Sequence, residues 1–185
     1  ADHGDITAET GTEKQCPPER QVFYACCQLF NNRTEGSNKN NMINKRRYHC
    51  TINESFADVL AGCACTDNRI EEENAWLGPD LLDTWMLLNE DGHAKSVEVW
   101  EEDELVGGLY GFVCGRAFIG DSMFSLVPSA SKLAMIHLAR HMQSQGGGII
   151  DCQLETPHLK SMGARYISYD DYLSSTLSPD TILWP

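Results

Sequence analysis

Four stretches of the chain combine apolar side chains at helical spacing with residues typical of helix ends. Residues 55–62 open on a Ser-Phe-Ala-Asp capping box, and residues 78–92 run from Gly-Pro-Asp to a closing glycine. Residues 129–145 begin at a serine cap, either Ser129 or Ser131, and carry Leu133 and Ile136 at helical spacing. A Thr-Pro pair begins residues 156–163, which end at a glycine. These patterns predict four helices.

Between the helices, apolar runs bounded by turn residues predict strands. Residues 96–100 and 105–113 form an expected hairpin around a charged turn. The adjacent glycines at 107 and 108 indicate a bulge or a close backbone approach. Single strands are expected at residues 21–24, 116–124, 149–154 and 165–172. This order of elements predicts an α+β fold with a mixed, mostly antiparallel sheet.

The length of 185 residues suits one domain with a small appendage, and a hydrophobic content of 42% is sufficient for a core. We expect a disordered polar tail over residues 1–15, a partial N-terminal α+β segment over 16–67 and the main domain over 68–185. No apolar run approaches the length of a membrane span. The net charge of −13 repels nucleic acid at long range and favours cationic partners, although an acidic surface also simply keeps a protein in solution.

The eight cysteines leave two interpretations open. Cys50, Cys63 and Cys65, together with His49, could bind a metal ion, but their spacing lacks the two-residue gap of common zinc sites. Reduced thiols, some of them buried as small hydrophobic side chains, explain the cysteines more simply. The sequence therefore predicts no metal centre and a location in the reducing cytoplasm.

Two polar residues, Asp151 and Gln153, interrupt the apolar strand that follows Gly146-Gly147-Gly148. Residues two apart on a strand project from the same face, so this strand presents a carboxylate and an amide side by side. A satisfied polar pair at the end of a sheet would explain them structurally. The alternative is a functional site.

Several short motifs occur in one order along the chain and together resemble the leucyl/phenylalanyl-tRNA–protein transferase family. The motifs are SVEVW at 96–100, DELVGGLYG at 103–111, SMFS at 122–125, ASK at 130–132 and IDCQ at 150–153. The resemblance extends over about residues 16–173. The family's more N-terminal aromatic segment has no counterpart in this sequence, which therefore resembles a divergent, N-terminally shortened member.

The resemblance implies an acyltransferase fold like that of the GNAT superfamily, in which strands 116–124 and 149–154 splay apart around the acyl donor. It also implies an enzyme that moves Leu, Phe or Met from aminoacyl-tRNA to the N-terminal amine of proteins beginning with Lys or Arg, which marks them for degradation. The resemblance implies that no metal or coenzyme would be needed. Because the aminoacyl ester is already activated, no covalent intermediate would be required either.

On this resemblance, Asp151, Gln153 and Asp121 are the expected catalytic residues. Gln153 would accept a hydrogen bond from the attacking amine, and Asp151 would orient Gln153. Asp121 stands where the family carries the longer glutamate, and a strand-end cap would explain it structurally. The substrate pocket is expected to include Trp76, Trp85, Phe118, Met142 and Ser122, although aromatic residues at helical spacing are also common in cores. A basic cluster for tRNA phosphates is expected at Lys39, Lys45, Arg46 and Arg47.

Two other functions fit the sequence. The first is an acyltransferase that uses another donor such as acyl-CoA, although residues 124–132 lack a glycine-spaced loop that would hold a pyrophosphate. The second is a non-catalytic protein that binds cationic N-termini through its acidic surface.

Overall fold

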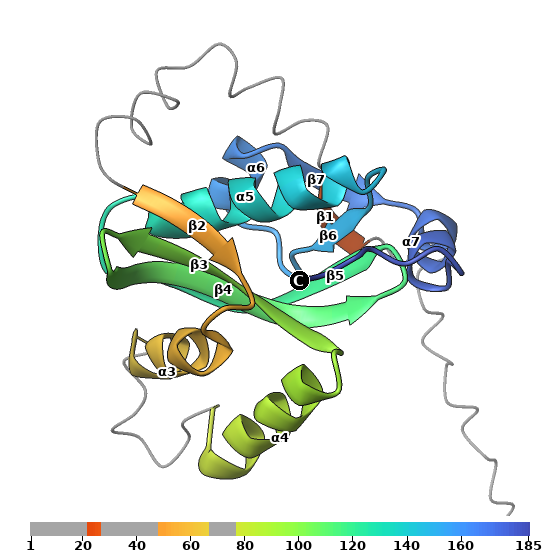
Figure 1. Ribbon diagram of the computed structural model, residues 1–185. Coiled ribbons are helices and arrows are strands. Elements are labelled where there is room, and N and C mark those ends of the chain that lie inside the picture. Colours follow the sequence, from red (N-terminus) through yellow and green to blue (C-terminus); the bar gives the residue numbers. More distant parts are fainter. Residues whose placement is uncertain (1–21, 27–47, 67–76) are drawn as a thin grey trace, which may run out of the picture.

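One mixed sheet organises the computed structural model, which describes residues 22–26, 48–66 and 77–185 (Figure 1). Its strand order is β2-β3-β4-β5-β6-β1-β7. All neighbouring strands in it are antiparallel except β5 and β6, which are parallel. The strands are β1 (Val22–Cys26), β2 (Tyr48–Ile52), β3 (Ala94–Glu101), β4 (Glu104–Cys114), β5 (Ala117–Ser125), β6 (Ile149–Asp151) and β7 (Ala164–Ile167). The predicted α+β class and mostly antiparallel sheet are confirmed.

Helices cover both faces of the sheet. Figure 1 shows α5 lying across one face, whereas α3 and α4 lie against the other. The sequence assigns β1, β2 and α3 to an N-terminal segment. In the structure, β1 and β2 are strands of this same sheet, and α3 packs against it. The helices are α3 (Phe56–Thr66), α4 (Pro79–Glu90), α5 (Ala130–Ser144), α6 (Pro157–Ser161) and α7 (Tyr169–Thr176). The four predicted helices are confirmed, and α7 is an addition.

Each face of the sheet has its own buried core. Val97, Leu109, Phe118 and Ile150 pack beneath α5. On the opposite face, Tyr110 and Phe124 belong with residues of α3 and α4 to a second cluster, which includes Phe56, Val59, Leu60, Cys63 and Trp85. The alternation of side chains along β4 explains this division, because Leu109 and Tyr110 are neighbours and point to opposite faces.

The parallel pair β5–β6 is short and ends where the predicted site residues begin. Ala117 to Ile119 pair with Ile149 to Asp151, and the pairing stops there. On the other side of β5, Tyr110 pairs with Ser122 and Gly111 with Gly120, which leaves Asp121 as the extra residue of a β-bulge. The sheet therefore opens between β5 and β6 next to the bulge.

Two predicted strands are shorter than expected. Strand β6 ends at Asp151, so Gln153 lies in the following turn with a φ of 58° rather than on the strand. Strand β7 ends at Ile167, because the Ser168 side chain caps a new helix by accepting a hydrogen bond from the Asp171 N–H. The predicted strand over 165–172 is therefore wrong in its second half, where a serine cap starts helix α7.

The glycine at position 107 is predicted to be required for the close packing of α5 on β4. A Cβ atom at Gly107 would lie 2.5 Å from the Ala130 Cβ and 3.2 Å from the Phe124 carbonyl oxygen. Gly107→Ala should therefore lower the free energy of unfolding by about 1–3 kcal/mol, measured by urea denaturation. Gly78→Ser is the control, because Gly78 is an N-cap with nothing within 4 Å of its Cβ direction. Equal losses in both variants would contradict the prediction.

Candidate active site

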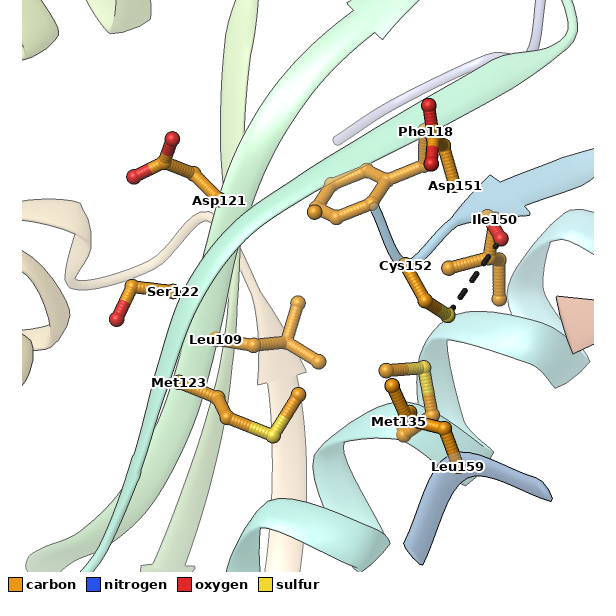
Figure 2. A pocket seen from close by; sticks show the side chains of 11 residues that line it. Leu109, Phe118, Asp121, Ser122, Met123, Met135, Ile150, Asp151, Cys152 and Leu159 are labelled. Carbon is orange, nitrogen blue, oxygen red and sulfur yellow. Dashed lines mark hydrogen bonds between the residues drawn. The ribbon is translucent and has the colours of Figure 1, made fainter. Parts of the chain in front are cut away.

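A cavity of about 290 Å³ lies where β5 and β6 separate. Strands β4, β5 and β6, helices α5 and α6 and the turn after β6 supply its wall (Figure 2). Its apolar side chains come from Leu109, Phe118, Met123, Met135, Ile150 and Leu159, and Cys152 adds a thiol. Gly120, Asp121, Ser122 and Asp151 complete the lining. This composition suits an apolar group that is attached to a polar, reacting one.

The bulge in β5 separates the polar from the apolar side chains. Figure 2 shows Leu109 and Met123 on the side of β5 that faces Met135, with Asp121 and Ser122 projecting from the other side. In an undisturbed strand, Asp121 and Ser122 would point to opposite faces, so the extra residue places both on one side.

The Asp151 carboxylate organises the turn after β6. It is only 7% exposed, and its Oδ1 accepts a hydrogen bond of 2.8 Å from the Gln153 backbone N–H. This bond closes a tight turn in which Gln153 adopts the left-handed conformation. The predicted placement of Asp151 and Gln153 side by side on one face of a strand is wrong, because β6 ends at Asp151 and Gln153 lies in the turn, where its backbone amide donates to the Asp151 carboxylate.

The Gln153 side chain reaches from this turn to strand β5. Its Nε2 donates a hydrogen bond of 2.7 Å to the Gly120 carbonyl oxygen. Because a carbonyl oxygen can only accept, the amide nitrogen must face Gly120 and the amide oxygen must point away from it. Gln153 is exposed, so this oxygen can meet a ligand that enters between β5 and β6.

Asp121 has an unusual environment on the α3 and α4 face of the sheet. Its Oδ2 is buried, as is the hydroxyl of Tyr110, and neither has a hydrogen-bond partner among the described residues. Burial raises the pKa of Asp121, and the nearby Tyr110 hydroxyl opposes that rise. Burial and the Asp121 carboxyl raise the pKa of Tyr110. The two groups are therefore close enough to interact, although their geometry falls short of a hydrogen bond.

The register of the sheet places Asp121 and Asp151 on the same face. Ile119 pairs directly with Asp151, and Asp121 follows Ile119 by two positions on β5. Residues paired across strands, and residues two apart along one, share a face. The two carboxyl groups therefore lie on the same side of the opening between β5 and β6.

The structure brings together some of the predicted pocket residues. Phe118 and Ser122 line the cavity. Trp85 instead packs edge-on against Tyr110 with ring centroids 4.8 Å apart, and Met142 is fully buried beside Gly148. Neither of these two residues lines the cavity. Trp76 and the basic cluster Lys39, Lys45, Arg46 and Arg47 lie outside the described residues.

Sequence reasoning missed most of the apolar wall, namely Leu109, Met123, Met135, Ile150 and Leu159. These residues come from five different elements and share no local pattern. The one signal available was position, because Met123 lies in the SMFS motif, two residues after Asp121.

Metal-binding clusters and membrane-spanning helices are both absent from the ranges that the structure describes. These ranges contain no group of three or more His, Cys, Asp or Glu side chains that could hold a metal ion, and neither Cys50 nor Cys63 forms a disulfide within them. No helix within them is long and apolar enough to cross a membrane.

Comparison with known proteins identifies the family. Residues 29–177 match the family model described as leucyl/phenylalanyl-tRNA protein transferase. The chain belongs to this family. A leucyl/phenylalanyl-tRNA–protein transferase of Chromohalobacter salexigens is 46% identical over 142 residues, which are 73% of this chain and 54% of that protein. The protein of the same name from Hydrogenovibrio crunogenus is 42% identical over 139 residues, 75% of this chain and 54% of its own length.

The transferase family members and a solved structure overlap this chain only in part. The chain spans about half the length of these curated relatives. A crystal structure of a conserved protein of unknown function from Bacteroides thetaiotaomicron superposes with a TM-score of 0.54 at 12% identity, over 76% of this chain and 53% of that one. This second likeness concerns the fold alone. The GNAT-like assignment stays a prediction.

Proposed function

We propose that this family member is an aminoacyltransferase that moves Leu, Phe or Met from aminoacyl-tRNA to the N-terminal amine of an acceptor protein beginning with Lys or Arg. Family membership supports the class of reaction. The same proposal includes the acceptor class, a role in marking proteins for degradation, a tRNA contact at the basic cluster and a cytoplasmic location.

One observation carries this proposal: an apolar cavity and an oriented amide lie at the same opening in the sheet. The cavity is the size of a large apolar side chain with part of its backbone, and Leu109, Met135 and Ile150 form part of its wall. The Gln153 amide lies at the edge of β5 through its bond to Gly120. A donor that places its side chain in the cavity would bring its ester carbonyl to this edge.

The chemistry then requires orientation more than acid–base strength. The acceptor nitrogen attacks the ester carbonyl, the new C–N bond forms, and the bond to the ribose oxygen breaks. The Gln153 amide oxygen is too weakly basic to take a proton, so it accepts a hydrogen bond and aligns the amine. The proton released by the amine passes to the leaving ribose oxygen. The nearby Asp151 carboxylate favours the positive charge that develops on nitrogen.

The proposed transfer can be tested with leucyl-tRNA carrying a labelled amino acid and two peptides that differ only in their first residue. Label should appear on the peptide that begins with Arg and not on the one that begins with Glu. Binding of the first peptide without transfer would support the non-catalytic alternative. Turnover of acetyl-CoA with neither result would support the other acyltransferase and overturn the proposal.

The cavity should decide which donors are accepted. Met123→Trp is expected to lower transfer of Leu, Phe and Met by at least about 10-fold, because the larger ring occupies the space of the donor side chain. Initial rates with the three aminoacyl-tRNAs measure this. Leu126→Trp is the matched control, since Leu126 is 63% exposed just beyond the end of β5 and does not line the cavity. A similar loss in both variants would show that the cavity is not the donor site.

A further inference from the structure

The hydroxyl group of Tyr110 is buried in a position that packing alone does not explain. Tyr110 is fully buried at the centre of β4, and its ring is held edge-on by Trp85 at 4.8 Å and by Phe56 at 6.0 Å. A phenylalanine would make the same ring contacts. An unpaired buried hydroxyl costs about 1–3 kcal/mol, so its presence requires a partner.

The Asp121 carboxyl is the polar group that faces this hydroxyl. Its Oδ2 is also buried without a partner among the described residues, while the residue as a whole lines the cavity. The β-bulge directs Asp121 to the face of the sheet where Tyr110 lies. Other titratable groups on this side include Asp151 on β6, Cys63 on α3 and the fully buried Glu98 on β3, which accepts hydrogen bonds from the Thr51 and Ser96 hydroxyls.

We propose that Tyr110 is a positioning residue for Asp121: its fixed hydroxyl donates to Oδ2 when the carboxyl turns toward it, and so holds Asp121 at the cavity wall. Trp85 and Phe56 keep the phenol in place and thereby define where Asp121 rests. A rotation of the Asp121 side chain would bring Oδ2 into the hydrogen bond with this hydroxyl that the present geometry does not make. This inference rests on the proposed function only for its effect on transfer.

The role of Tyr110 can be tested on the protein without any substrate. In Tyr110→Phe the ring contacts remain, and the loss of the donor hydroxyl should raise the pKa of Asp121, because a hydrogen bond to a carboxylate favours its ionised form. Carboxyl-carbon NMR titration of Asp121 measures the shift. Tyr166→Phe is the control, since Tyr166 is 45% exposed on β7 and does not line the cavity. An unchanged Asp121 titration in Tyr110→Phe would overturn the proposal.

Transfer rates provide a second, separable test. Tyr110→Phe is expected to lower kcat on the order of 10-fold, and to have no further effect when Asp121 is already replaced by Asn. An equal loss in both backgrounds would overturn the proposal, because Tyr110 would then act independently of Asp121. If the wild-type protein transfers nothing, the proposed function fails, whereas the titration still decides whether Tyr110 holds Asp121.

Discussion

Gln153→Ala is expected to lower aminoacyl transfer by at least about 100-fold while the protein remains folded. The side chain makes its described contact across the opening, from Nε2 to the Gly120 carbonyl oxygen. It is exposed, so its loss removes no core packing. The amide oxygen that would align the acceptor amine is lost with it. Single-turnover transfer to a peptide beginning with Arg measures the effect, and circular dichroism reports the fold.

Two further variants make this expectation sharper. Gln153→Glu keeps the length of the side chain but sets a carboxylate against the Gly120 carbonyl oxygen, so it should also lose transfer. Leu154→Ala changes the next residue, which is 74% exposed and does not line the cavity, and should transfer normally. Normal transfer by Gln153→Ala would show that the amide has no part in the reaction.

Asp151→Ala is expected to reduce transfer by a similar factor, on the order of 100-fold, and to destabilise the fold by about 1 kcal/mol. The carboxylate holds the Gln153 backbone N–H at 2.8 Å and thereby fixes the turn that presents the Gln153 side chain. Its removal frees that turn and also removes the negative charge beside the developing ammonium. Transfer rates and thermal unfolding measure the two effects separately.

Asp151→Asn distinguishes geometry from charge. Asparagine retains an oxygen that can accept from the Gln153 N–H, so the turn and the stability should be preserved. Transfer should fall between the rates of the wild type and Asp151→Ala if both contributions matter. A wild-type rate in Asp151→Asn would assign the whole role of Asp151 to holding the turn.

Local chemistry explains why the helices were predictable from the sequence. Helix α4 begins at Pro79 after Gly78, and α6 begins where Thr156 accepts from the Leu159 N–H, as the capping patterns indicated. The strand over 165–172 failed because the Ser168 cap, also a local signal, was overlooked. The end of β6 was harder to predict from the sequence, because Ile-Ile-Asp-Cys-Gln has the pattern of a continuous strand. The strand ends because the Asp151 side chain accepts a hydrogen bond from the backbone N–H of Gln153.

The sequence by itself determined the fold class, the family resemblance and the motif that contains Asp151 and Gln153. These depend on periodicity, capping and short motifs, which act over a few residues. The tertiary structure alone showed that Gln153 leaves the strand and crosses to Gly120, and that Asp121 faces Tyr110. It also showed that residues from five elements enclose the cavity. Such contacts join positions as far apart as Leu109 and Leu159, and only packing of the sheet against α5 and α6 brings them together.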